Sequence, residues 1–152
     1  MKEDFVQSIQ NRLEEEEIRR LIRQALAARE KAYAPYSRYL VGAALLCRDG
    51  EIVTGCNIEN AAYTPSNCAE RTAFFRAVSS GRRDFRAIAV TGGKADSVRL
   101  DLSYPCGVCR QVMEEFCDPD RFLVITARSE TDYLVCTLAE LLPHGFGPSN
   151  VL

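Results

Sequence analysis

The sequence predicts an α/β fold, in which helices cover both faces of a mixed sheet of about five strands. The chain has 152 residues, a length that suits one domain with one hydrophobic core. Apolar runs alternate with helical segments in the middle of the chain, which indicates parallel crossovers. An Asp49-Gly50 pair between two apolar runs indicates an antiparallel hairpin. We therefore expect a three-layer α/β/α domain over residues 1–152.

The first predicted element is a helix over residues 5–28. Apolar residues recur at helical spacing in two stretches, from Phe5 to Leu13 and from Ile18 to Leu26. The acidic run Glu14–Glu17 interrupts this stripe. It is compatible with a solvated turn of one helix or with a joint between two helices.

The remaining elements follow in a regular order. Pro35 disfavours helix at the residue before it and ends the first helical pattern. Strands are predicted over residues 40–47, 52–58, 85–91, 121–126 and 133–137. Helices are predicted over residues 69–79, 106–117 and 138–142, with glycine or Asp-Pro pairs as stop signals.

Charge and composition narrow the class of function. The net charge of −2 gives no general attraction to a phosphate backbone, which argues against nucleic acid as a partner. The sequence has no run of the ~20 apolar residues that span a membrane and no signal-peptide pattern at its start, so we expect a cytoplasmic protein. Its seven cysteines are an odd number, and disulfides are rare in that compartment, so some thiols need another use.

Two segments carry the residue types of a metal site, Asn67–Thr72 and Ser103–Arg110. Each lies where a loop is predicted to become a helix. Cys106 and Cys109 are three residues apart, which places both sulfurs on one face of a helical turn. Cys68 begins the earlier helix, so all three thiols lie at helix N-termini, where exposed N–H groups and the helix dipole stabilise thiolates.

Three cysteine ligands predict an open zinc site, with a fourth position for water. Glu70 is too close to Cys68 for a comfortable second ligand, and we expect it to contact that water and pass a proton to the substrate. Arg71 and Arg110 are placed to offset the charge of three thiolates by hydrogen bonding to sulfur. Cys-x-Glu followed by Pro-Cys-x-x-Cys matches the signature of zinc-dependent deaminases.

Other uses of these thiols remain open at this stage. A structural zinc site with Cys56 or Cys117 as fourth ligand would leave Glu70 unexplained. Thioredoxin-like redox chemistry would require an active-site turn that the Cys-x-x-Cys does not follow here. The cysteines outside the motif are expected to fill the core. His144, the only histidine, lies between a proline and a glycine and is expected to be a loop residue.

Beyond the motif, the chain resembles the small, homotetrameric cytidine deaminases from about Ile18 to Pro148. The resemblance is carried by the strings Tyr36-Ser-Arg-Tyr-Leu-Val-Gly-Ala-Ala-Leu46, Gly55-Cys-Asn-Ile-Glu-Asn-Ala61, Cys68-Ala-Glu-Arg-Thr-Ala73, Pro105-Cys-Gly-Val-Cys-Arg-Gln-Val112 and Leu141-Leu-Pro-His-Gly-Phe-Gly-Pro148. Residues 1–14 fall outside this core and are expected to add a helical extension. The resemblance implies the cytidine-deaminase fold and hydrolysis of cytidine and 2′-deoxycytidine to uridine, 2′-deoxyuridine and ammonia in pyrimidine salvage.

The resemblance also implies roles for individual residues. One Zn²⁺ per subunit is bound by Cys68, Cys106 and Cys109, while Glu70 protonates ring N3 and shuttles protons to the leaving ammonia. The positions that match substrate-binding residues of the family are Tyr39, Asn57, Glu59, Ala61, Tyr63, Ala69 and Phe146.

Within that set, Asn57 and Glu59 match residues that bind the ribose 3′-hydroxyl, and an amide and a carboxylate are suitable partners for it. Ala61, Tyr63 and Phe146 match residues that reach the site from a neighbouring subunit. At Tyr39 the family usually has phenylalanine, so this chain's extra hydroxyl requires a partner that the family pattern does not supply.

Competing functions make different demands on the sequence. Deoxycytidylate deaminases and nucleic-acid editing deaminases generally have histidine as the first ligand, where this chain has Cys68. Deaminases of blasticidin-type antibiotics share the cysteine motif but lack the Asn-Ile-Glu-Asn string at residues 57–60. A non-catalytic, zinc-stabilised interaction module would have no need of Glu70. The expected partner is a small nucleoside, with neither nucleic acid nor membrane.

Overall fold

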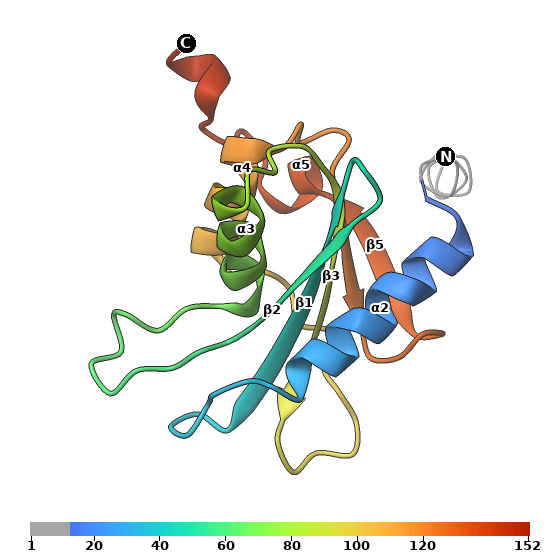
Figure 1. The fold of residues 1–152 in the computed structure, drawn as a ribbon, viewed down its shortest axis with the longest axis vertical. Helices are drawn as coiled ribbons and strands as arrows, with labels where there is room; N and C mark the ends of the chain where they lie inside the picture. Colours follow the sequence, from blue (N-terminus) through green and yellow to red (C-terminus); the bar gives the residue numbers. More distant parts are fainter. Residues whose placement is uncertain (1–12) are drawn as a thin grey trace.

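The computed structural model describes residues 13–152, which form a five-stranded sheet between helices (Figure 1). In chain order the elements are α2 (Glu15–Arg29), β1 (Tyr39–Cys47), β2 (Ile52–Cys56), α3 (Ala69–Ser79), β3 (Phe85–Lys94), α4 (Gly107–Phe116), β4 (Leu123–Ala127), β5 (Tyr133–Thr137), α5 (Leu138–Leu141) and a 3-10 turn at Pro148–Asn150. The strands lie in the order β2-β1-β3-β4-β5. The predicted α/β class with a mixed five-stranded sheet is confirmed.

The strand directions place the N-termini of two helices at the same end of the strands. β1 is antiparallel to both β2 and β3, so β2 and β3 run the same way on either side of it. β4 is parallel to β3, and β5 is antiparallel to β4. Because β2 precedes α3 and β3 precedes α4, both helices begin beyond the carboxyl ends of strands that point the same way.

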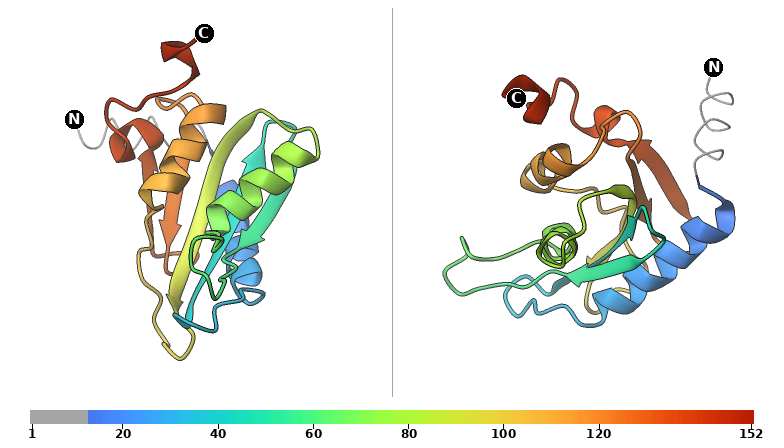
Figure 2. Two further views of the ribbon diagram at one scale, coloured as in Figure 1. Left: turned by 90° about the vertical axis from the view of Figure 1, so that its left-hand side faces the viewer. Right: turned by 45° about the horizontal axis from the view of Figure 1, so that its top comes forward.

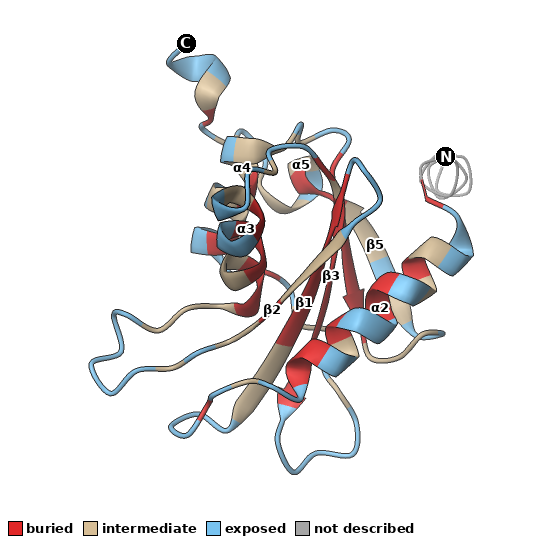
Figure 3. Cartoon of the chain, viewed as in Figure 1, coloured by how far each residue is buried: buried red, intermediate tan, exposed pale blue. Residues whose placement is uncertain are grey.

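The helices cover the two faces of the sheet unequally (Figure 2). α2 lies on one face, and its apolar side chains Ile18, Leu21 and Ile22 pack against the inward residues of β1, β3 and β4. α3, α4 and α5 lie on the other face, where Phe74 and Met113 join a second core. Residues on the central strands are buried on both sides (Figure 3), which is why these strands appear in the sequence as nearly continuous apolar runs.

Two glycines allow the helices to approach the sheet closely. A Cβ atom at Gly42 in β1 would lie 2.0 Å from the carbonyl oxygen of Ala25 in α2. A Cβ atom at Gly55 in β2 would lie 2.5 Å from the backbone of α3 at both Ala69 and Ala73. Both contacts are with backbone atoms, so a larger side chain would have to displace the helix.

Of the helix predicted over residues 5–28, the structure describes α2 from Glu15 onward. The N–H of Glu14 donates to Glu17 Oε2 at 3.2 Å, and the helix starts at Glu15. The acidic run therefore forms the N-terminal turn, where the helix dipole favours negative charge, and Leu13 and Glu14 are not helical. The remainder of the helical extension predicted over residues 1–14 lies outside the described residues.

Several strand limits differ from prediction by one to three residues, including β1 at Tyr39–Cys47 and β4 at Leu123–Ala127, and two of the differences affect the site. β2 ends at Cys56, two residues early, so Asn57 and Glu59 lie in the loop that follows it. β3 continues through its two glycines to Lys94, because Gly92 and Gly93 pair with β1. Among residues 13–152, none of the helices combines the length and the apolar character needed to cross a bilayer.

Candidate active site and metal centre

Three cysteine sulfurs meet where α3 and α4 begin. Cys68 is the N-cap residue of α3, Cys106 is the N-cap residue of α4, and Cys109 lies in the first turn of α4. The Cys68 and Cys106 sulfurs are 3.8 Å apart, and those of Cys106 and Cys109 are 3.5 Å apart. All three lie within 4.8 Å of one another, so the predicted convergence of residues 68, 106 and 109 is confirmed.

This sulfur geometry fits zinc. Three sulfurs, each about 2.3 Å from a tetrahedral Zn²⁺, lie roughly 3.8 Å from one another. Among the described residues, no fourth histidine, cysteine or carboxylate joins the group. Cys56 instead contacts the Lys31 carbonyl, and Cys117 lines a separate cavity, so neither completes a structural four-cysteine site. The cluster has the donor set of an open zinc site.

The ionisation of the cluster also favours a cation. A hydrogen bond from the Cys109 thiol, together with contacts from Arg71 and Cys106, lowers the pKa of Cys68 to about 5. The bond to Cys68 and burial raise the pKa of Cys109, which therefore keeps its proton beside the Cys68 thiolate. A divalent cation among the sulfurs would favour all three thiolates, which are the form that binds zinc.

The two arginines that follow the cysteine ligands have different partners. Arg71 Nη2 donates to the Cys68 sulfur at 3.4 Å, as predicted. Arg110 Nη1 donates instead to the Leu141 carbonyl oxygen at 2.5 Å, which joins α4 to α5. No described hydrogen bond joins Arg110 to a sulfur, so that expectation is corrected. Arg110 is one position beyond Cys109, and this step of about 100° around the helix turns it toward α5.

Glu70 lies in the first turn of α3, two residues after Cys68, and only 5% of it is exposed. It lines the same cavity as Cys68 and Cys106. Burial raises the pKa of Glu70, and the negative charge of Cys68 raises it further. A carboxyl group with a raised pKa exchanges protons more readily near neutral pH than an ordinary surface glutamate does.

The cavity beside the sulfurs has a volume of about 450 Å³, within the range of roughly 300–1,000 Å³ that is typical of small-molecule sites. Eight of the predicted site residues line it, namely Tyr39, Asn57, Glu59, Cys68, Ala69, Glu70, Arg71 and Cys106. Six further residues line it without having been predicted, namely Val41, Ser66, Asn67, Val90, Ser103 and Tyr104. Of these, Asn67, Ser103 and Tyr104 belong to the two segments singled out above, but spacing alone assigned them no role.

Asn57 and Glu59 are held by the backbone of the preceding segment. The Asn57 amide accepts from the Val41 N–H and donates to the Tyr39 carbonyl, both at 2.8 Å, and so extends the pairing of β1. Glu59 Oε1 accepts from the N–H groups of Tyr36 and Ser37 at 3.0 and 3.1 Å. These backbone bonds, chiefly the one from Ser37, lower the pKa of Glu59.

Three predicted substrate-binding residues lie away from this cavity. Ala61 and Tyr63 are exposed on the loop between β2 and α3, which extends from the body of the chain in Figure 1. Phe146 is exposed near the C-terminus, where Gln111 Nε2 donates to its carbonyl oxygen at 2.8 Å. Within one chain, these residues do not join the sulfur cluster.

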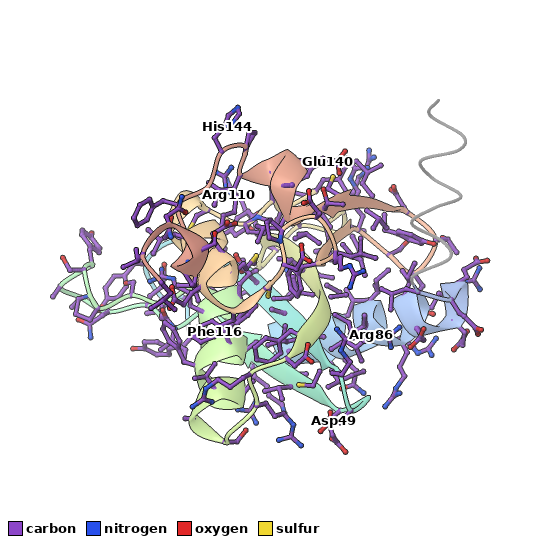
Figure 4. All side chains as sticks on the ribbon, turned by 90° about the horizontal axis from the view of Figure 1, so that it is seen from above. Asp49, Arg86, Arg110, Phe116, Glu140 and His144 are labelled. Carbon is purple, nitrogen blue, oxygen red and sulfur yellow. The ribbon has the colours of Figure 1, made fainter. Side chains whose placement is uncertain are left out.

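His144 and the four cysteines outside the metal motif lie away from the cavity beside the sulfurs. His144 lies in an exposed turn as expected, and its side chain extends outward in Figure 4. Cys47 is part of the core and Cys117 packs against it. Cys56 and Cys136 are only half-buried, so the expectation of core filling is wrong for these two.

Comparison with known proteins agrees with this geometry. Residues 15–126 match the profile described as the cytidine and deoxycytidylate deaminase zinc-binding region. A cytidine deaminase of Sporosarcina psychrophila is 47% identical over 135 residues, which cover 89% of this chain and 95% of that protein. One from Halalkalibacterium halodurans is 53% identical over 126 residues, which cover 83% and 91%.

A solved structure supports the same assignment. The crystal structure of cytidine deaminase from Burkholderia pseudomallei matches with a TM-score of 0.75 and 48% identity, and the match covers 84% of this chain and 97% of that one. The zinc-binding profile covers the segment that contains Cys68, Cys106 and Cys109. The chain belongs to the family of zinc-dependent cytidine and deoxycytidylate deaminases.

Proposed function

We propose that this protein hydrolyses the exocyclic amine of cytidine and 2′-deoxycytidine, releasing uridine or 2′-deoxyuridine and ammonia. The observation that carries the proposal is a buried glutamate beside three converging sulfurs in a cavity of nucleoside size. The activity named for the Sporosarcina and Halalkalibacterium relatives supports the choice of cytidine as substrate.

Cys68, Cys106 and Cys109 would hold the Zn²⁺, which supplies a water activated for attack at neutral pH when it is bound. Glu70 acts as the proton carrier. Its burial and raised pKa allow it to hold a proton, deliver it to ring N3 and later pass one to the leaving amine. Arg71 stabilises the Cys68 thiolate through its hydrogen bond and limits the negative charge next to Glu70.

We assign the sugar to the end of the cavity lined by Asn57 and Glu59. A carboxylate offers about four acceptor sites, so Glu59 can accept from a ribose hydroxyl in addition to its bonds from Tyr36 and Ser37. The Asn57 NH₂ group donates one hydrogen to Tyr39 and has a second hydrogen for the substrate. The backbone contacts fix both groups before the substrate arrives, which reduces the entropic cost of binding.

We also propose that the protein is a cytoplasmic homotetramer whose sites lie at subunit interfaces. Tyr63 and Phe146 are 72% and 63% exposed, and the loop that bears Tyr63 projects away from its own subunit (Figure 1). Exposed aromatic side chains of this kind are typical of buried positions in an assembly. Ala61, Tyr63 and Phe146 would then contact a nucleoside bound in a neighbouring subunit. Each chain would form a single domain.

The test is an ultraviolet assay of cytidine deamination on the zinc-loaded protein, with the Glu70→Gln variant and zinc analysis in parallel. We expect Glu70→Gln to retain zinc and fold but to lose at least 10³-fold in kcat, an order of magnitude based on the usual cost of losing an acid–base group. Extraction of the metal with a chelator should abolish turnover, and added Zn²⁺ should restore it. No turnover by the wild type, or equal turnover by Glu70→Gln, would refute the proposal and favour a non-catalytic zinc module.

A further inference from the structure

Tyr39 carries a hydroxyl that is joined to two side chains more than sixty residues away. Its ring lines the cavity, and its Oη lies 2.9 Å from Asp101 Oδ2 and 2.7 Å from Ser103 Oγ. Ser103 lines the same cavity and is half-buried. The Tyr39 hydroxyl therefore has two defined side-chain partners.

The backbone of β3 builds this arrangement. The N–H of Asp101 donates to the carbonyl of Gly92 at 2.8 Å, so the segment before α4 pairs briefly with the end of β3. A Cβ atom at Gly92 would lie 2.4 Å from Ser103 Oγ and 3.2 Å from Tyr39 Cε1. The absence of a side chain at Gly92 is thus what allows Tyr39 and Ser103 to meet against the strand.

The chemistry of the three groups fixes the direction of their hydrogen bonds. The Tyr39 hydroxyl has a single hydrogen, and it donates this hydrogen to Asp101 Oδ2. In the 2.7 Å hydrogen bond between Tyr39 Oη and Ser103 Oγ, the Ser103 hydroxyl is therefore the donor. Burial raises the pKa of Tyr39, which keeps its proton in place. The Ser103 hydrogen is committed to this bond, and its oxygen is left as an acceptor.

We infer that Tyr39 is a positioning residue that sets Ser103 as a hydrogen-bond acceptor for the bound nucleoside. The inference rests on the proposed function, because it presumes that the nucleoside occupies this cavity. The group that Ser103 recognises is a donor, either a sugar hydroxyl or the exocyclic amine of the base. Tyr39 acts through Ser103 and is not assigned to the chemistry, which belongs to Glu70.

The experiment compares steady-state kinetics of the zinc-loaded wild type with Tyr39→Phe, Ser103→Ala and the double variant. Tyr39→Phe keeps the ring but frees the Ser103 hydroxyl to rotate, and Ser103→Ala removes the acceptor. We expect each single variant to raise KM for cytidine by about 3- to 10-fold, the usual range for one hydrogen bond, with kcat within about two-fold. The double variant should resemble Ser103→Ala alone, because both changes break one interaction.

Substrate analogues identify the donor. If the donor is a sugar hydroxyl, Ser103→Ala should have no effect on KM for whichever of 2′-, 3′- or 5′-deoxycytidine lacks that hydroxyl. An equal rise in KM for cytidine and all three analogues assigns the bond to the exocyclic amine. Tyr133→Phe, on the distant strand β5, is the matched loss of a tyrosine hydroxyl and should leave KM and kcat unchanged.

Two results would overturn the inference. One is an unchanged KM for cytidine in Tyr39→Phe or Ser103→Ala. The other is a double variant whose fold-increase in KM equals the product of the fold-increases of the two single variants. The melting temperature and zinc content of each variant show whether a change in its kinetics comes only from unfolding. A change of that origin also counts against a positioning role. If the wild type deaminates cytidine, either result rejects this inference alone, whereas an inactive wild type rejects the proposed function.

Discussion

Arg71 and Arg110 show how two residues of the same type and similar sequence context acquire different tasks. Each comes directly after a residue of the cysteine motif, and spacing predicted a bond to sulfur for both. In the structure only Arg71 reaches a sulfur, whereas Arg110 donates to the Leu141 carbonyl. The side chain of Arg71 thus contacts the cysteine cluster, and that of Arg110 joins α4 to the end of α5.

This difference predicts opposite outcomes for a matched pair of substitutions. Arg71→Gln should weaken zinc binding by about 10- to 100-fold, the usual cost of losing a partner of a metal ligand. Arg110→Gln should leave zinc affinity within about three-fold but reduce the free energy of unfolding by about 1–2 kcal/mol, since a charged hydrogen bond is lost. Competition with a chromophoric chelator measures the first quantity, and denaturant unfolding of the zinc-loaded protein measures the second. Equal loss of zinc affinity in both variants would restore a sulfur-bonding role for Arg110.

At the scale of elements, the site depends on how closely α3 lies against β2. Gly55 faces the backbone of α3 at its first turn, next to Cys68 and Glu70. The position of α3 relative to β2 therefore sets the distance from Cys68 to Cys106, which belongs to the other helix.

Gly55→Ala should displace α3 and affect stability and metal binding together. A Cβ atom 2.5 Å from backbone atoms cannot be accommodated by a side-chain rotation, so we expect a loss of about 1–3 kcal/mol in unfolding free energy, together with weaker zinc binding. Calorimetric melting and chelator competition measure the two effects.

Gly107→Ala is the matched control for that substitution. Gly107 begins α4, and the nearest atom to its added Cβ would be 4.0 Å away. Alanine there should leave the melting temperature unchanged or raise it slightly, because alanine favours helix over glycine by about 0.5–1 kcal/mol. A Gly55→Ala variant as stable as Gly107→Ala would contradict the proposed close contact.

At the scale of the whole molecule, each chain contains the cluster of three cysteines and the cavity beside it, but some of its expected substrate-binding residues face outward. Phe146 is 63% exposed and lies outside the cavity of its own chain. If assembly completes the site, a chain that lacks the Phe146 ring should damage a neighbour's site and leave its own catalytic residues intact.

Subunit complementation tests this. Phe146→Ala and Glu70→Gln should each have low activity alone, the first through raised KM and the second through lost proton transfer. Co-refolded mixtures should recover activity, because a Glu70→Gln subunit supplies Phe146 to a neighbour whose Glu70 is intact.

Light scattering should give a mass near four times the 17.0 kDa chain. The control is Glu70→Gln mixed with Val98→Ala, a fully exposed residue, which should show no gain beyond the activity of Val98→Ala itself. A monomeric mass, or mixtures without recovery, would contradict assembly at the site.

The sequence by itself determined the order of the elements and the three cysteines that converge in a cluster able to hold a metal ion. α3 and β5 have the predicted limits, 69–79 and 133–137, because helical periodicity, strand propensity and turn residues act over a few positions. The trio Cys68, Cys106 and Cys109 was predictable because ligand chemistry and helix-start signals are both local in the sequence.

Only the tertiary structure decided which distant groups meet. The start of α2 at Glu15 depends on a cap that the apolar stripe does not reveal, and the partner of Arg110 depends on where α5 packs. Tyr39, Asp101 and Ser103 come together only because β1 and β3 pair and Gly92 leaves room between them. Such contacts depend on the packing of whole elements, whose relative placement is not encoded in the spacing of neighbouring residues.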